Sequence, residues 1–211
     1  MSSPYSTISS RVSLGPGRSP TLLPLVAQFL IRRRILLSGI LFSLLVAGDV
    51  AFGAKPHDLA NFRDPLSVAG GLLVLSGLAL RSWAVGILRK DAELTTTGPY
   101  RLIRNPLYVG SFLMMFGFIA LINDPYNIVL ILGPMMVIYI VKVRQEERLL
   151  ATKFPAQWTA YARATPRFFP RIARASLTAD WRGSQWMRSR EYQAVGATIA
   201  ALAAIEVWQL I

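Results

Sequence analysis

Long apolar stretches alternate with short polar connections along most of this chain. Each of these stretches is close to the roughly 20 residues that an α-helix needs to cross the hydrocarbon core of a bilayer. The pattern therefore predicts an all-α, polytopic membrane protein with about five transmembrane helices. The predicted spans cover residues 35–54, 66–88, 107–122, 126–143 and 193–210.

The chain ahead of the first span carries different signals. Residues 1–21 are rich in Ser and Pro, which predicts a disordered tail. The apolar run 22–31 is too short to span a bilayer. It is followed by Arg32–Arg34, whereas in a signal peptide the basic residues precede the apolar core. We divide the chain into a disordered or interfacial N-terminal segment (1–34), a core of four spans with the helix that leaves the membrane (35–170), a basic cytoplasmic connector (171–192) and a C-terminal fifth span (193–211).

Composition supports this picture. The chain is 53% hydrophobic but only 16% charged, with a net charge of +12, whereas about a quarter of the residues in a soluble domain are charged. Nucleic-acid binding would need a soluble basic face, which a chain buried largely in lipid does not offer. There is no Cys, and His57 is the single His. This composition leaves no thiolate nucleophile and no transition-metal ligand set.

The distribution of Lys and Arg predicts the orientation in the membrane. The connection 89–106 and the segment 144–192 are strongly basic, as is the N-terminal segment, whereas the loop 55–65 holds only Lys55 and Arg63. Positively charged flanks stay on the cytoplasmic side. We therefore expect the N-terminus inside and the C-terminus outside, in a bacterial plasma membrane or the endoplasmic reticulum.

Three ionisable residues lie within predicted spans, where a charge is a functional hypothesis by default. Arg81 is close enough to the cytoplasmic end of its span for the side chain to reach the interface. Asp49 and Glu206 lie towards the outer ends of theirs, where water is near. We interpret all three as structural.

Small residues recur at four-residue spacing in the first and last spans. Such stripes let helix backbones approach closely in lipid, either within one chain or across a homodimer. The two stripes are Gly39, Ser43 and Ala47, and Gly196, Ala200 and Ala204.

Polar residues concentrate on either side of the third and fourth spans. "GPYRLIRNPLYVG" (98–110) leads into the third span, and "KVRQEER" (142–148) leaves the fourth. The turn between these spans is so short that they must form an antiparallel hairpin, which brings both motifs to one patch at the cytoplasmic boundary. The patch gathers Tyr100, Arg104, Asn105, Tyr108, Lys142, Arg144, Glu146 and Glu147.

The chemistry of this patch suits a zwitterionic or cationic small molecule. Tyr rings can face a sulfonium through cation–π attraction. Glu146 can accept hydrogen bonds from an ammonium or from ribose hydroxyls, and Arg104 can hold a carboxylate. The same residue types also serve as an interfacial anchor of Tyr and Arg beside turn prolines. The residue types alone leave both interpretations open.

The order of these motifs resembles a known family. "GPYR-x2-RNPLY-x-G", an apolar hairpin and "EER-LL-x3-F-x6-Y-x4-PRFFP" are similar to the integral-membrane methyltransferases, which include isoprenylcysteine carboxyl methyltransferases and phospholipid N-methyltransferases. The resemblance covers about residues 90–170. It implies that S-adenosylmethionine is the cofactor and that the candidate cofactor-binding residues are Glu93, Leu94, Thr95, Tyr100, Asn105, Pro106, Tyr108 and Glu146.

The resemblance also implies roles around the methyl acceptor. The candidate catalytic residues are Lys142, Arg144 and Arg104, and Lys142 stands where the carboxyl methyltransferases use an Arg on the substrate. Lys lacks the planar fork that grips a carboxylate in two places, so this departure weakens a carboxylate acceptor more than methyl transfer itself. Asn105 stands where the family motif has His. An Asn side chain can still make a hydrogen bond, but it has no titratable ring.

These expectations add up to an S-adenosylmethionine-dependent membrane methyltransferase acting on a lipophilic or lipid acceptor. The acceptor would resemble an isoprenylcysteine carboxylate or a phospholipid amine. Two alternatives stay open: a membrane-embedded NAD(P)H-dependent reductase of related fold, and a non-catalytic membrane protein.

Overall fold

The computed structural model describes residues 44, 47–49, 51, 53, 55–89, 93–123, 126–170, 177 and 179–210. All regular elements in these residues are helices. The predicted segment 1–34 and most of the predicted span 35–54 lie outside the described residues. The long helices are α2 (Pro65–Ile87), α4 (Pro106–Ile122), α5 (Tyr126–Lys153) and α8 (Glu191–Leu210), and the short ones are α3 (Pro99–Leu102), α6 (Pro155–Ala164) and α7 (Gly183–Arg188).

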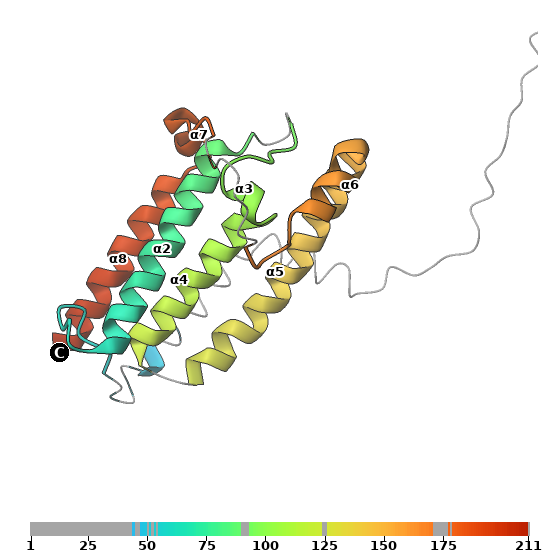
Figure 1. The fold of residues 1–211 in the computed structure, drawn as a ribbon. Helices are drawn as coiled ribbons and strands as arrows, with labels where there is room; N and C mark the ends of the chain where they lie inside the picture. The colour runs from blue at the N-terminus through green and yellow to red at the C-terminus, as the bar shows by residue number, and fades with distance from the viewer. Residues whose placement is uncertain are drawn as a thin grey trace, which may run out of the picture.

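The long helices stand side by side in the order α8, α2, α4, α5 (Figure 1). One end of this bundle carries α3, α6 and α7 and is called the motif end below. The opposite end, called the turn end, carries the loop 55–64, the α4–α5 turn and the last residues of α8. The predicted hairpin is confirmed, because α4 and α5 run antiparallel between these ends.

Local sequence sets where these helices begin and end. Pro65 is the first residue of α2, and the Asp64 side chain accepts a hydrogen bond from the backbone N–H of Leu66 at 3.0 Å. Pro106 likewise opens α4, as the sequence predicts, because a helix start does not use the N–H that proline lacks. Asn123 closes α4 in the left-handed region, with φ of 61°.

Two pairs of glycines bring α2 and α4 into backbone contact. A Cβ added at Gly77 would lie 2.5 Å from the carbonyl oxygen of Gly110, and one added at Gly117 would lie 2.6 Å from that of Gly70. The tightest packing of the bundle therefore requires glycine at these positions. It also gives Gly110, the last residue of "RNPLYVG", a structural role.

The small-residue stripes predicted from sequence are not this contact. Gly196, Ala200 and Ala204 are exposed on α8, and a Cβ at Gly196 would meet nothing within 4 Å in the structure. Of the other stripe, Gly39 and Ser43 lie outside the described residues. Within the described residues the α8 stripe makes no close helix contact, and its packing against the rest of the chain or against a second copy stays a prediction.

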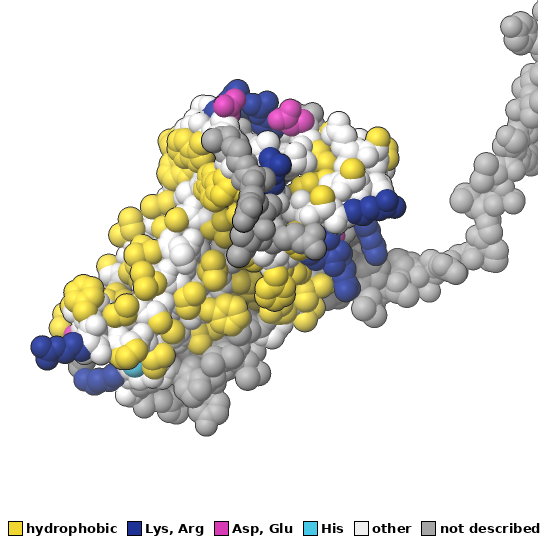
Figure 2. Space-filling model, in the orientation of Figure 1, with side chains coloured by type: hydrophobic (Ala, Val, Ile, Leu, Met, Phe, Trp, Pro, Cys, Tyr) yellow, Lys and Arg dark blue, Asp and Glu magenta, His cyan; other side chains and the backbone are white. Residues whose placement is uncertain are grey.

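The face of the bundle visible in Figure 2 is largely apolar along the helices. Leu72 and Leu75 on α2 and Ile199 and Val207 on α8 are exposed. α2 and α8 are long and apolar enough to cross a membrane, whereas α4, with 17 residues, is a shorter apolar helix. All predicted spans that the structure describes are helical, and the five-span topology stays a prediction.

Candidate active site

Asn105 and Glu147 form the centre of the site at the motif end. The Asn105 side-chain amide donates a hydrogen bond to the Glu147 carboxylate at 3.0 Å, and both residues are buried. Asn105 is held by the start of α4, and Glu147 by the part of α5 that continues beyond the predicted span. The structure thus brings the two predicted motifs together, as the hairpin requires.

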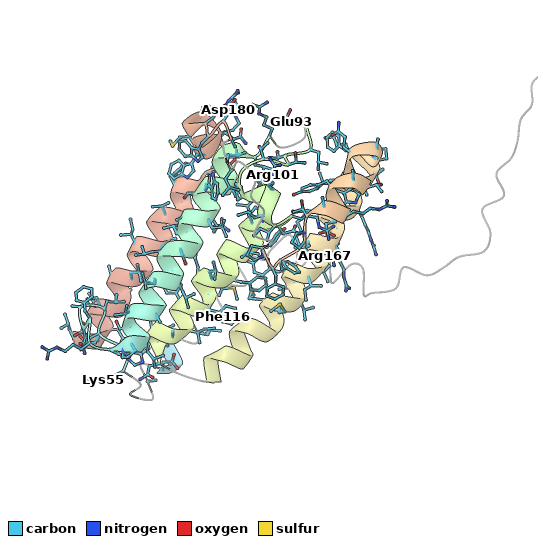
Figure 3. All side chains as sticks on the ribbon, in the orientation of Figure 1. Lys55, Glu93, Arg101, Phe116, Arg167 and Asp180 are labelled. Carbon is cyan, nitrogen blue, oxygen red and sulfur yellow. The ribbon has the colours of Figure 1, made fainter. Side chains whose placement is uncertain are left out.

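Arg167 completes this contact and was not singled out from the sequence. Its guanidinium donates to both oxygens of Glu147, with a shortest distance of 2.6 Å. The Arg104 guanidinium lies 3.6 Å from the same carboxylate. The signal for Arg167 was present in "PRFFP", a motif used for the resemblance without a role for its Arg. Figure 3 shows Arg167 beside α5, far from Lys55 at the turn end.

These contacts control the ionisation of Glu147. Burial acts to raise the pKa of this carboxyl, but hydrogen bonds from Arg167 and Asn105 and the positive charges of Arg104 and Arg167 outweigh it. The Glu147 pKa therefore lies below its usual range. In turn, the hydrogen bond to Glu147 raises the pKa of Arg167. Glu147 is a charged structural residue.

The segment after α6 is fastened to the start of α4 through the backbone as well. The Arg104 N–H donates to the Pro166 carbonyl at 2.9 Å, and the Asn105 side chain reaches the Arg167 carbonyl at 3.4 Å. The Tyr161 hydroxyl donates to the Tyr100 carbonyl at 2.7 Å. The "Y-x4-PRFFP" part of the family pattern therefore fixes the position of "GPYRLIRNP".

Glu146, the carboxylate predicted to hold the cofactor, has a different environment from Glu147. Its side chain is 43% exposed and lies 3.6 Å from Lys142, one turn earlier on α5. Arg144 is exposed on the same helix. Because Glu147 is already occupied by Arg167, Asn105 and Arg104, Glu146 is the member of the Glu pair that is accessible to a ligand.

Tyr100 contributes a buried hydroxyl that has no hydrogen-bond partner among the described residues. Burial raises the pKa of Tyr100, and the charges of Tyr161, Glu146 and Glu191 raise it further. The Nε of Arg104 is also buried without a partner in the described part of the chain, and its guanidinium lies 5.7 Å from the Trp158 ring centre. Because buried polar atoms are almost always hydrogen-bonded, these two are the candidate ligand contacts of the site.

Tyr108 and Pro106 lie in the wall of α4 that faces α5. Pro106 is fully buried, and the buried Tyr108 ring packs edge-on against Tyr139 of α5, with ring centres 5.3 Å apart. Tyr139 also packs edge-on against Phe112 at 5.2 Å. An aromatic wall therefore continues from the motif end into the bundle.

The predicted run Glu93–Thr95 folds back on the end of α2. Glu93 is exposed and pairs with Arg89 at 3.1 Å, Leu94 is buried, and the Thr95 hydroxyl accepts from the Arg89 N–H at 3.2 Å. The run lies at the motif end with Arg101 (Figure 3), while its described contacts are with Arg89.

The in-span ionisable residues have partners or are buried in the bundle. The Arg81 guanidinium donates twice to Glu191, the first residue of α8, at 2.9 and 3.1 Å and to the Ser111 hydroxyl at 2.6 Å. The sequence placed Asp49 near water, but it is buried. One carboxylate oxygen of Glu206 is buried without a partner among the described residues. These carboxylates and the Arg are therefore held within the bundle.

Comparison with known proteins identifies the family. A family model described as phospholipid methyltransferase matches residues 65–157. The cobalt-zinc-cadmium resistance protein CzcN of Cupriavidus metallidurans is 31% identical over 172 residues, covering 80% of this chain and 78% of its own length. The nickel-cobalt-cadmium resistance protein NccN of Alcaligenes xylosoxydans xylosoxydans is 32% identical over 148 residues, covering 69% of this chain and 68% of its own length. No solved structure matches significantly. This chain belongs to the phospholipid methyltransferase family of integral-membrane methyltransferases.

Proposed function

We propose that this protein transfers a methyl group from S-adenosylmethionine to a lipid acceptor at the cytoplasmic boundary of the membrane. The observation that carries this proposal is the buried Tyr100 hydroxyl, which has no partner among the described residues, together with the accessible Glu146 carboxylate. Family membership supplies the reaction class.

The residues present fit the cofactor. Glu146 can accept from an ammonium or from ribose hydroxyls. The buried Nε–H of Arg104, which has no partner in the described part of the chain, can donate to a carboxylate. The Tyr100 hydroxyl is protonated at neutral pH, as an ordinary tyrosine is, and can act as a donor. The Tyr108 ring lies one helical turn from Asn105 and adds an aromatic wall. S-adenosylmethionine, when bound, supplies a methyl group already activated by its sulfonium.

The role of the protein's own residues is to position the cofactor and the acceptor. Asn105, Glu147 and Arg167 hold the start of α4 against α5, so that ligand groups at the motif end keep a fixed distance from one another. An amine acceptor must lose its proton before its nitrogen can attack. Because Glu146 is assigned to the cofactor, this proton is released to water at the membrane boundary.

A phospholipid amine is the acceptor that these residues favour over a carboxylate. Lys142 gives a single point charge paired with Glu146, and not the planar fork that holds a carboxylate in two places. The family model that matches residues 65–157 is also that of phospholipid methyltransferases.

The same proposal includes a polytopic topology with the motif end in the cytoplasm. Lys and Arg are frequent at the motif end, on α5, α6, α7 and their connections, whereas Lys55 and Arg63 lie at the turn end. This asymmetry is the one that the positive-inside rule describes. The names of two relatives point to resistance to divalent metal ions as the cellular setting. A change in membrane headgroups is the contribution that a lipid methyltransferase would make there.

The test is methyl transfer in reconstituted vesicles. Protein in phosphatidylethanolamine vesicles, given S-adenosylmethionine with an isotope-labelled methyl group, is expected to label the lipid fraction. The variant Glu146→Gln should lose most of this label. If the protein binds S-adenosylmethionine but labels no lipid of a native membrane extract, the acceptor is not a lipid. If the protein oxidises NADPH and transfers no methyl group, the reductase alternative is favoured.

A further inference from the structure

A cavity of about 290 Å³ lies deeper in the bundle, between α2, α4, α5 and α8. Its wall consists of apolar and small side chains with a few hydroxyls and one guanidinium. The lining residues are Arg81, Ser111, Met114, Met115, Phe118, Tyr139, Ala194, Ala197 and Thr198. On α4 the lining runs from Ser111 to Phe118, roughly 8 to 18 Å from the first residue of the helix at 1.5 Å per residue. This depth corresponds to the hydrocarbon region below a headgroup.

Three polar side chains in this wall have partners among the described residues. The Arg81 guanidinium is paired with the buried Glu191 carboxylate, the Ser111 hydroxyl donates to the Leu107 carbonyl at 3.0 Å, and the Thr198 hydroxyl donates to the Ala194 carbonyl at 2.8 Å. A paired cation and carboxylate leave the cavity without net charge. The cavity therefore suits an uncharged, apolar chain and not a soluble ion.

The cavity and the candidate active site share a neighbouring aromatic residue. Tyr139 is in its wall and also packs on Tyr108, a predicted cofactor-binding residue. On the opposite side the wall is formed by α8, where Ala197 is both exposed at the surface of the chain and part of the lining. The cavity is thus open sideways beside α8, in the direction from which a lipid would enter.

We propose that this cavity binds one acyl chain of the phospholipid acceptor, with the headgroup held at the motif end. The proposal rests on the proposed function for the identity of the acceptor. Pockets for whole small molecules measure about 300 to 1,000 Å³, so this one takes part of a lipid while the second chain stays in the bilayer. Arg81 makes three hydrogen bonds in the described residues and has five N–H groups, which leaves donors for the ester oxygens of the lipid.

α8 lies outside the matched family region, which ends at residue 157. The proposed acyl-chain site therefore includes a segment for which the sequence predicts a membrane span and no function. We expect the acyl chains that fit to be determined on this side by Ala194, Ala197 and Thr198.

The test is photo-crosslinking with a defined lipid. Phosphatidylethanolamine that carries a diazirine in one acyl chain is incorporated in nanodiscs together with the full-length protein. The sample is then irradiated, and the adducts on the protein are mapped by mass spectrometry. Adducts are expected on Met114 and Met115. Ala197→Leu, which fills the cavity, should reduce them at least fivefold while adducts on the outward-facing Leu72 and Leu75 stay unchanged.

Ala200→Leu is the matched control, because Ala200 is exposed on α8 and is not part of the lining. It should leave the Met114 and Met115 adducts unchanged. Equal labelling of Met115 and Leu75, or labelling that Ala197→Leu does not reduce although the variant keeps its melting temperature, would overturn the site.

Calorimetry with S-adenosylmethionine on the same samples separates this proposal from the proposed function. Cavity labelling together with cofactor binding supports both. Cavity labelling without cofactor binding keeps an acyl-chain site but overturns its assignment to a methyl acceptor. Cofactor binding without cavity labelling overturns the site alone.

Discussion

The side-chain amide of Asn105 donates to the carboxylate of Glu147 at 3.0 Å and joins two motifs that are 42 residues apart in the sequence. Arg167 binds the same carboxylate from a third segment. The start of α4, the exit of α5 and the segment after α6 are therefore fixed to one another through one buried charge. This arrangement separates the two neighbouring glutamates: Glu147 is buried among its partners, whereas Glu146 is accessible.

The first prediction concerns that separation. Glu147→Gln removes a charge that accepts from Arg167 and Asn105, so we expect a loss of about 1.5–3 kcal/mol in the free energy of unfolding. Glu146→Gln should change stability by less than about 0.5 kcal/mol, because its ion pair with Lys142 is half-exposed. Thermal unfolding in detergent measures both. A larger loss for Glu146→Gln would reverse the two roles.

The pH dependence of stability follows from the lowered pKa of Glu147. A carboxyl with a lower pKa in the folded state adds stability above its unfolded pKa, about 4.3 for Glu, and this stability is lost as the pH falls through the folded value. The difference in melting temperature between wild type and Glu147→Gln should be constant from pH 7 to about 5 and shrink below about 4. A difference that persists unchanged at pH 3 would show that the charge is not its cause.

Position 105 gives a third prediction. Asn105→Asp places a second carboxylate beside Glu147 and removes a donor, so it should cost at least about 1.5 kcal/mol of stability at pH 7. Asn105→His, the residue of the family motif, keeps a ring donor and should cost less than Asp. Unfolding of the three proteins at one pH tests the order. If Asp is tolerated as well as His, the Asn105–Glu147 hydrogen bond does not matter for folding.

The contact of α2 with α4 gives a fourth prediction. Gly77→Ala introduces a Cβ 2.5 Å from the Gly110 carbonyl oxygen, and overpacking of this kind costs about 1–3 kcal/mol. Gly71→Ala is the control on the same helix, because its Cβ would meet nothing within 4 Å. It should be neutral or stabilise the helix by up to about 1 kcal/mol. Equal behaviour of the two variants in thermal unfolding would contradict the close packing.

The sequence was informative where a feature depends on length and order. Apolar runs placed α2, α4, α5 and α8, and the short connection at Asn123 implied the hairpin that brings Asn105 to Glu147. The short helices α3, α6 and α7 were not predicted, because elements of four to ten residues show little periodicity.

The features that the sequence missed depend on contacts between distant segments. Glu191 precedes the predicted fifth span by two residues, and nothing local links it to Arg81, 110 residues earlier. Arg167 belongs to the motif "PRFFP", but nothing in the sequence indicates that it pairs with Glu147. The glycines that matter for packing, Gly70 and Gly77, are seven residues apart, so a search at four-residue spacing did not find them.

The most direct test of the account is binding of S-adenosylmethionine to the purified protein, since it needs no knowledge of the acceptor. Isothermal titration in detergent is expected to show micromolar affinity for the wild type, with NADPH as a control that does not bind. Glu146→Gln should weaken the affinity at least tenfold, about 1.4 kcal/mol, at an unchanged melting temperature. Absence of S-adenosylmethionine binding to folded wild-type protein would contradict the methyltransferase assignment.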